Sequence, residues 1–151
     1  MNTPQLESTM LDRIHAMLSG RVAPPPIAEL IGFTLSSVEE GRAVIRFEAE
    51  ERHANPMGSL HGGVMCDIAD AAMGMAYAST LGPGESFTTL ELKINFLKPF
   101  WKGTLHAIGE VVKRGNTVGF VECDVQDDKG QLIAKASSTC MTLKGTRAHG
   151  R

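Results

Sequence analysis

Hydrophobic residues recur at helical spacing in two parts of the chain. Residues 4–19 carry Leu, Met and Ile at this spacing and end at a glycine, which predicts a short amphipathic helix ahead of the stiff proline stretch 23–26. Residues 61–80 are apolar at most positions and are closed by Gly82 and Pro83. This second pattern predicts one long helix.

Apolar and polar residues alternate with a period of two through most of the remaining sequence, as they do in half-buried strands. Residues 33–50 predict two short strands that turn at Glu40-Gly41. Four more strand-like runs follow, separated by turn residues: 86–100, 103–115, 117–130 and 131–145. In the first of these runs, alternation places Thr89 on the sheet face opposite Leu90 and Leu92.

These elements predict an α+β fold. The antiparallel hairpins form one sheet, and only one long helix is available to cover its apolar face. We therefore expect a curved antiparallel β-sheet wrapped around one long central α-helix. Small residues let the sheet approach this helix from several sides: Ala69, Ala71, Ala72, Gly74, Ala76 and Ala78.

Composition and charge narrow the class of protein. A chain of 151 residues with 42% apolar and 21% charged residues is typical of one globular domain. A net charge of −2 does not favour nucleic-acid binding, and no run approaches the roughly 18–20 apolar residues of a membrane span. The three cysteines and the absence of a visible secretory signal favour a cytoplasmic protein. We expect a helix and connector at 1–24, the main domain at 25–144 and a flexible tail at 145–151.

The start of the long helix, His61-Gly62-Gly63, carries the first candidate chemistry. Backbone N–H groups at a helix start lack intrahelical partners, and glycine lets a ligand oxygen approach them closely. The Gly62 N–H is therefore a candidate for polarising a carbonyl, as an oxyanion hole does. The alternative is that the two glycines only make a tight entry into the helix.

Asp70 lies inside the apolar stretch of the same helix, where an ionised carboxylate is costly unless it is paired or functional. Eight residues separate it from Gly62, about 12 Å along the helix axis. This is too far for both groups to act on one small reacting centre within a single chain. A two-fold dimer with antiparallel central helices would bring Gly62 of one chain near Asp70 of the other. Asp67 is interpreted as a dipole partner or a surface group.

The sequence resembles the hotdog-fold acyl-CoA thioesterases, and among them the phenylacetate-pathway (PaaI-like) branch. The resemblance covers roughly residues 25–144. Its motif positions are His53, Asn55, Gly58, His61-Gly62-Gly63, Asp70, Gly74 and the run "TTLELKINFLKP". It implies hydrolysis of an acyl-CoA thioester by a homo-oligomer, a homodimer or a homotetramer built as a dimer of dimers, with sites at the subunit interface. It implies no metal and no cofactor other than the coenzyme A of the substrate.

The resemblance also implies a role for each matching catalytic position. Asp70 resembles the acid that activates water as general base or attacks the thioester itself, and Gly62 resembles the amide that polarises its carbonyl. His61 and Asn55 resemble residues that orient the loop and the thioester or water. Thr89 resembles the hydroxyl residue that helps to place the nucleophilic water.

Substrate-binding residues are expected in two places. An aromatic or medium-chain acyl group would contact the N-terminal segment and the central helix, whose methionines make an adaptable lining. The candidate contacts on the helix are Gly63, Met65, Met73 and Tyr77. The phosphates of coenzyme A would dock on the basic stretch 93–114, where four residues are candidates: Lys98, Lys102, Lys113 and Arg114.

One alternative function shares this fold: a protein that binds acyl-CoA without turnover, as a sensor or carrier. The joint presence of Asp70 and Thr89 favours the enzyme, because binding alone does not need that pair. A metal hydrolase is disfavoured because the His and Asp residues of 53–70 follow no metal-ligand spacing. A serine hydrolase is disfavoured because the sequence has no GxSxG motif.

Overall fold

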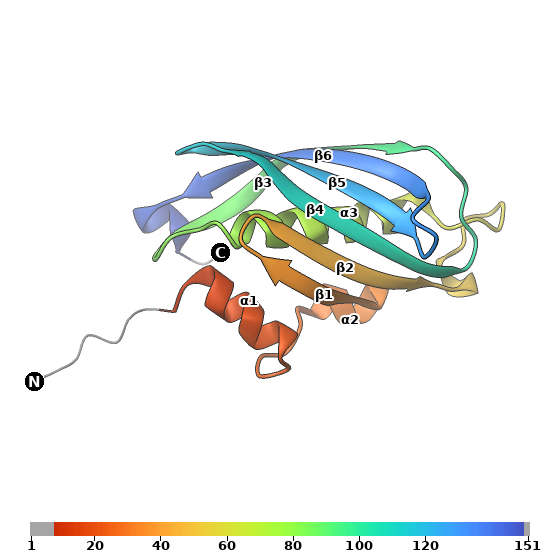
Figure 1. Cartoon of the computed structure of the whole chain (residues 1–151), viewed down its shortest axis with the longest axis horizontal. Helices are drawn as coiled ribbons and strands as arrows, with labels where there is room; N and C mark the ends of the chain where they lie inside the picture. Colours follow the sequence, from red (N-terminus) through yellow and green to blue (C-terminus); the bar gives the residue numbers. More distant parts are fainter. Residues whose placement is uncertain (1–7, 150–151) are drawn as a thin grey trace, which may run out of the picture.

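A computed structural model describes residues 8–149 of the chain and shows one six-stranded antiparallel sheet curved around a long helix (Figure 1). The strands lie in the order β1-β2-β4-β5-β6-β3, so β1 and β3 form the two edges. The predicted α+β hotdog architecture is therefore confirmed. The strands are β1 (Phe33–Glu39), β2 (Arg42–Ala49), β3 (Ser86–Phe96), β4 (Gly103–Arg114), β5 (Val118–Asp127) and β6 (Leu132–Leu143).

The long helix α3 (Gly62–Ala78) packs against β4, β2 and β5 on the inner face of the sheet. Its small side chains bring the sheet very close, since a Cβ added to Gly109 of β4 would lie 2.4 Å from the carbonyl oxygen of Ala72. Only glycine fits at this contact. The largest fully buried side chains come from α3 and from the strands: Ile68, Met73 and Tyr77 of α3, and Phe47, Ile45, Leu105, Ile133, Val121 and Val125 of the sheet.

The N-terminal segment contains two short helices. α1 (Met10–Leu18) begins with a capping box, in which the Thr9 hydroxyl accepts from the Asp12 N–H and the Asp12 carboxylate accepts from the Thr9 N–H. Part of the predicted helix, before residue 8, lies outside the described residues. α2 (Pro26–Ile31) was not predicted from the sequence. The proline stretch supplies its first residue, a position where the missing N–H costs nothing, and Gly32 ends it with a φ of 90°.

Two single-turn 3-10 helices complete the chain. η1 (Glu51–His53) leads from β2 into the loop before α3, and η2 (Gly145–Ala148) follows β6. The part of the predicted tail at 145–148 is therefore a helical turn. No helix in the region 8–149 is long and apolar enough to cross a membrane.

The register of β3 corrects one prediction. A β-bulge between Thr89 and Glu91 leaves Leu90 as an extra residue opposite β6, with 52% of its surface exposed. The bulge shifts the alternation, so Thr89 and Leu92 both face α3 and the core. The predicted placement of these two residues on opposite faces is wrong because simple alternation does not count the extra residue.

Candidate active site

The start of α3 presents one backbone N–H without an internal partner. His61 is the N-cap residue, and its Nδ1 atom accepts a hydrogen bond of 2.8 Å from the Gly63 N–H. Over the described range 8–149, no acceptor bonds to the Gly62 N–H. The ring of Phe96 lies over this residue, since a Cβ on Gly62 would come within 2.8 Å of it. Gly62 thus offers an amide at the positive end of the helix dipole.

The loop before α3 is held by Asn55. Its Oδ1 accepts from the Met57 N–H over 2.9 Å, and its Nδ2 donates to the Ser59 hydroxyl over 2.9 Å. The His61 N–H in turn donates to the carbonyl of His53. Both side-chain groups of Asn55 are therefore used in shaping the loop that delivers the helix start. This geometry fits the loop-orienting part of its predicted role.

Asp70 lies on the side of α3 that the sheet leaves uncovered, and its side chain is exposed in the single chain. Asp70 lies inside the apolar stretch, as the sequence shows, but its neighbours Ile68 and Ala69 are the residues that form the buried face of the helix. Partial desolvation of the carboxylate nevertheless raises the pKa of Asp70 above its ordinary value. The bond from Thr89 opposes this pKa increase, and the nearby negative charge of Asp67 adds to it.

Thr89 reaches Asp70 from the neighbouring edge strand. Its Oγ1 donates to Oδ1 of Asp70 over 3.4 Å. The two residues are nineteen positions apart in the sequence, and the β3 bulge at Leu90 lets Thr89 and the core-facing Leu92 lie on the same face of the strand. An acid and a hydroxyl are thus held together beside an open groove.

The amide and the acid lie in separate hollows of one chain. Gly62 lines a hollow of about 390 Å³ with Asn55, Met65, Phe96 and Lys98. The other hollow, of about 450 Å³, contains Asp70 and Thr89 and runs between α1, α3 and β3. We call it the Asp70 groove. The expected separation of about 12 Å along α3 agrees with this arrangement.

The predicted acyl-contact residues differ in where the fold places them. Met65 lines the Gly62 hollow, and Gly63 is exposed beside it. Met73 and Tyr77 are instead packed in the core, with 1% and 0% of their surfaces exposed. The Tyr77 hydroxyl shares a buried hydrogen bond with Thr142. These two residues lie too deep in this structure to contact an acyl group.

The four predicted phosphate-binding residues do not form one cluster in a single chain. Lys98 and Lys102 lie near the start of α3 and β4, where they contact Gln131 and Glu51 respectively. Lys113 and Arg114 end β4, roughly 35 Å along the strand from Lys102. Arg114 lies over the Tyr77 ring and forms an ion pair of 3.4 Å with Glu85, which makes it a structural residue.

Sequence reasoning missed other residues of these hollows. Phe96 covers Gly62, and the α1 side chains Met10, Ile14 and Met17 form one wall of the Asp70 groove. The exposed ring of Phe96 was read only as part of an alternating strand. The apolar spacing of α1 predicts a buried face, and the N-terminal segment is an expected acyl contact, but no local pattern in the sequence places this face beside Asp70.

Cys66 and Asp67 lie about one helical turn before Asp70 on α3. Burial raises the pKa of Asp67, and burial together with the charges of Asp67 and Asp70 raises the pKa of the Cys66 thiol. Among residues 8–149, no three His, Cys, Asp or Glu side chains are grouped to hold a metal ion. The charge of the half-buried Asp67 adds to the raised pKa of Asp70.

The curved antiparallel sheet around one helix defines a hotdog-fold protein. Its free amide at the helix start and its acid two turns further along give it the layout of a thioester hydrolase. The chain belongs to the Thioesterase superfamily, whose sequence profile matches residues 57–134.

Three known proteins illustrate this relationship. The 1,4-dihydroxy-2-naphthoyl-CoA hydrolase of Listeria monocytogenes is 30% identical over 118 residues, covering 78% of this chain and 96% of that protein. Acyl-coenzyme A thioesterase 13 of Homo sapiens is 31% identical over 108 residues, covering 70% and 76%. The structure of the E. coli PaaI protein from the phenylacetic acid degradation operon matches with a TM-score of 0.79 at 25% identity, over 91% and 95% of the two chains. The predicted resemblance to the PaaI-like branch is confirmed.

Proposed function

We propose that this protein hydrolyses an acyl-CoA thioester to the free acid and coenzyme A, with an aromatic or medium-chain acyl group. The observation that carries this proposal is the pair formed by Asp70 and Thr89 in one groove and the unpartnered Gly62 N–H at the start of the same helix. Thioester hydrolysis needs these parts: a polarised carbonyl, a positioned water and a base. It needs no metal or redox cofactor.

In this mechanism the Gly62 N–H donates to the thioester oxygen, and the helix dipole favours the negative charge that develops there. Asp70 removes a proton from water, whose oxygen attacks the carbonyl carbon. The C–S bond then breaks, and the thiolate of coenzyme A takes up a proton. The raised pKa of Asp70 makes its carboxylate a better base than an ordinary aspartate, since base strength increases with pKa.

The catalytic unit of the proposal is a two-fold dimer, because one chain holds the acid and the amide in separate hollows. β3 is an edge strand of eleven residues, and its exposed apolar side chains Leu90 and Phe96 would be covered by a second copy. Pairing of two β3 edges about a two-fold axis sets the α3 helices antiparallel. Gly62 of one protomer then approaches Asp70 of its partner.

The test uses two variants that each lose one half of the site. Asp70→Asn removes the base, and Gly62→Pro removes the N–H at a helix position where proline is tolerated. The extended conformation of His61 is also compatible with a following proline. Each variant alone should release coenzyme A thiol from acyl-CoA at least a hundredfold more slowly than the parent chain.

Refolding the two variants together in equal amounts gives the decisive result. Half of the dimers are then mixed, and each mixed dimer has one intact site of two, so about a quarter of the parent activity should return. Recovery of no activity, with mixed dimers present by mass spectrometry, contradicts the shared site. If the folded parent chain binds acyl-CoA and turns over none, the proposal of an enzyme is wrong and a sensor or carrier is indicated.

Hydrolysis in ¹⁸O-labelled water distinguishes the two roles of Asp70. With Asp70 as general base, a single turnover places the label in the released acid. With Asp70 as nucleophile, the first turnover places the label in the Asp70 carboxylate, because water attacks the acyl-enzyme anhydride there. We propose the general-base role, because Thr89 holds the carboxylate beside the groove where a water can be placed.

A further inference from the structure

The Asp70 groove continues past the catalytic groups into a second hollow. Met17 of α1 and Met75 of α3 line the groove at the end near Val22. The same two side chains line a hollow of about 410 Å³ between α1, α2 and β1. The two hollows therefore meet at a pair of methionines, and we call the second one the distal hollow.

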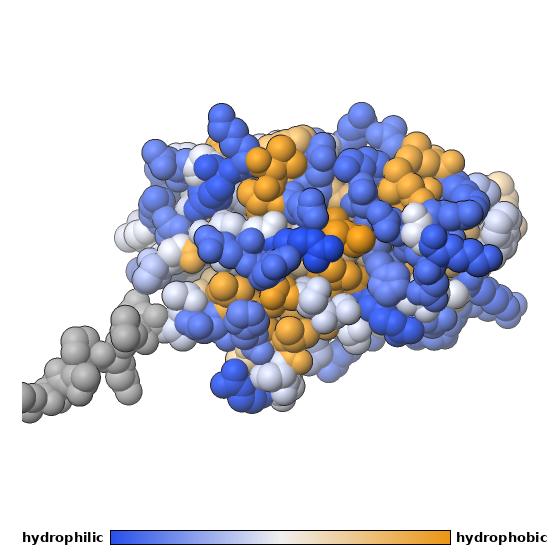
Figure 2. Space-filling model, in the orientation of Figure 1, coloured by the Kyte–Doolittle hydropathy of each residue, from blue (hydrophilic) through white to orange (hydrophobic). Residues whose placement is uncertain are grey.

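The distal hollow is mainly apolar, and its polar side chains are Glu29 and Thr34. Its walls include Leu18, Pro24, Ala28, Phe33 and Leu35, and Ile45 of β2 closes its inner side. Figure 2 shows apolar side chains gathered on this face of the molecule, where α1 lies beside β1. Such a lining offers water few hydrogen-bond partners, and it suits a hydrocarbon group.

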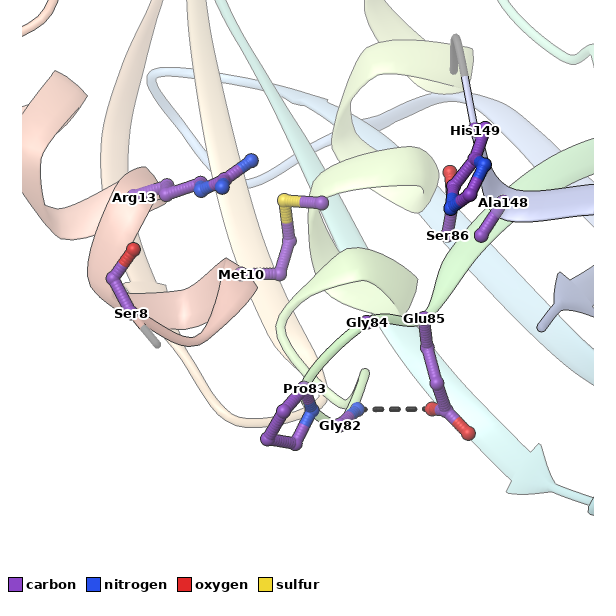
Figure 3. Close-up of a pocket in the computed structure, with 10 residues that line it drawn as sticks. All are labelled: Ser8, Met10, Arg13, Gly82, Pro83, Gly84, Glu85, Ser86, Ala148 and His149. Carbon is purple, nitrogen blue, oxygen red and sulfur yellow. Dashed lines mark hydrogen bonds between the residues drawn. The ribbon is translucent and has the colours of Figure 1, made fainter. Parts of the chain in front are cut away.

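The opposite end of the groove has a different character. There Met10 and Arg13 also line a hollow with Glu85, Ser86 and His149 (Figure 3). The Glu85 carboxylate in this hollow accepts from the Gly82 N–H and pairs with Lys144. A charged and polar lining favours water over hydrocarbon. An apolar chain that begins at Asp70 is therefore better accommodated toward Met17 and Met75.

We propose that the distal hollow is the far part of the acyl site and takes the end of a linear acyl chain at the upper end of the medium-chain range, about twelve carbons, whose thioester lies at Asp70. Met17 and Met75 form the gate between the two parts. This inference rests on the proposed function and adds a substrate class to it. The gate lies five residues from Asp70 along α3, about 7.5 Å. A short acyl group or a single ring ends before the gate, and a longer chain passes it.

Two features allow the gate to open. Methionine side chains are unbranched and flexible, and both are only half-buried here. Of the α1 residues, Ile14 alone is fully buried, so a small shift of this helix breaks few core contacts. Each further methylene that the distal hollow buries adds about fourfold to affinity.

The experiment compares hexanoyl-CoA with dodecanoyl-CoA. Leu18→Trp fills the distal hollow from a partly exposed position, and His15→Trp on the same helix is the matched control, because His15 is exposed and lines neither hollow. In the parent chain, kcat/KM should be higher for dodecanoyl-CoA. Leu18→Trp should lower the dodecanoyl-to-hexanoyl ratio at least tenfold, and His15→Trp should leave this ratio within twofold. A ratio that Leu18→Trp does not change overturns the proposal.

A binding measurement separates this inference from the proposed function. Calorimetry on the Asp70→Asn variant gives the affinity for the same two thioesters without turnover. Tighter binding of dodecanoyl-CoA that Leu18→Trp abolishes supports the distal hollow even if the parent chain hydrolyses nothing. Equal affinity for both chain lengths overturns it even if the parent chain is an active thioesterase. Met17→Trp, which blocks the gate itself, should reproduce the Leu18→Trp result in both assays.

Discussion

The Thr89 hydroxyl on the edge strand β3 donates a hydrogen bond of 3.4 Å to the Asp70 carboxylate on the central helix α3. This bond stabilises the ionised acid and so lowers the pKa of Asp70, whereas desolvation and the charge of Asp67 raise it. Desolvation is the largest of the three effects, and the pKa is raised overall. The acid is therefore tuned by neighbours that can be removed one at a time.

Removing these two neighbours should move the pH profile in opposite directions. Activity requires ionised Asp70, so kcat/KM falls as the pH drops through its pKa. Thr89→Val removes the bond that lowers this pKa, and the acidic limb should move to higher pH. Asp67→Asn removes a negative charge that raises the pKa, and the limb should move to lower pH. The measurement is kcat/KM between pH 4 and 9 for the three proteins. Shifts in the same direction would show that the limb does not report Asp70.

Two substitutions at Gly62 separate the amide from the space around it. Gly62→Ala keeps the N–H and adds a Cβ that would lie 2.8 Å from the Phe96 ring. Because a ring can turn aside, we expect Gly62→Ala to lose about tenfold in kcat, and Gly62→Pro, which lacks the N–H, to lose about a hundredfold to a thousandfold. Steady-state kinetics with one acyl-CoA checks this order.

The control for this pair is Gly62→Ala combined with Phe96→Leu, which relieves the contact with the ring. It should recover part of the alanine loss, whereas Phe96→Leu added to Gly62→Pro should recover nothing. Equal activity of the alanine and proline variants would mean that space, and not the N–H, is what Gly62 contributes.

Asp70→Asn should stabilise the folded protein at neutral pH. A folded-state pKa above the unfolded value means that stability falls as the pH rises through this interval and stays lower above it. Asparagine does not ionise, so the melting temperature of the Asp70→Asn variant should exceed that of the parent chain at pH 7. The two melting temperatures should converge near pH 3. Thermal unfolding at one protein concentration measures this, since an oligomer melts according to its concentration. A lower melting temperature for the variant at pH 7 would contradict the raised pKa.

Alanine substitutions at two glycines that face neighbouring elements should change the free energy of unfolding in opposite directions. A Cβ at Gly109 would lie 2.4 Å from the backbone oxygen of Ala72, and neither backbone can yield easily. Gly109→Ala should therefore destabilise the protein by about 1–3 kcal/mol. A Cβ at Gly74 in α3 would lie 3.5 Å from the Phe87 ring, an ordinary contact, so Gly74→Ala should stabilise by about 0.5–1 kcal/mol. Urea unfolding of both variants measures the two changes in the free energy of unfolding. Changes of the same sign would contradict the prediction.

The sequence pattern predicted the sheet and the long helix because alternation and helical spacing follow directly from which face is buried. It did not predict α2, whose prolines were read only as a stiff connector, although proline also suits the first turn of a helix. It also missed the β3 bulge, because an extra residue leaves no mark in a short run of alternating letters.

In the candidate site, too, the features set by local sequence could be predicted and those set by long-range packing could not. The helix start at Gly62 follows from local rules of capping and could be located from the sequence. The exposure of Asp70 and the depth of Met73 and Tyr77 depend on how α3 is rotated beneath the sheet. That rotation is set by long-range packing, such as the contact of Gly109 with Ala72, which no local pattern records.

The extra residue at Leu90 also bears on how this strand can change over evolutionary time. Thr89 pairs with Cys140 and Glu91 with Thr139, so Leu90 has no counterpart on β6. Deleting it would leave an unbroken ladder with the same neighbours, and Thr89 would still face the helix. β3 can therefore gain or lose one residue here without displacing the hydroxyl from the acid. When chains of this family are aligned, a gap of one residue between the threonine and the glutamate is the placement that keeps both in register.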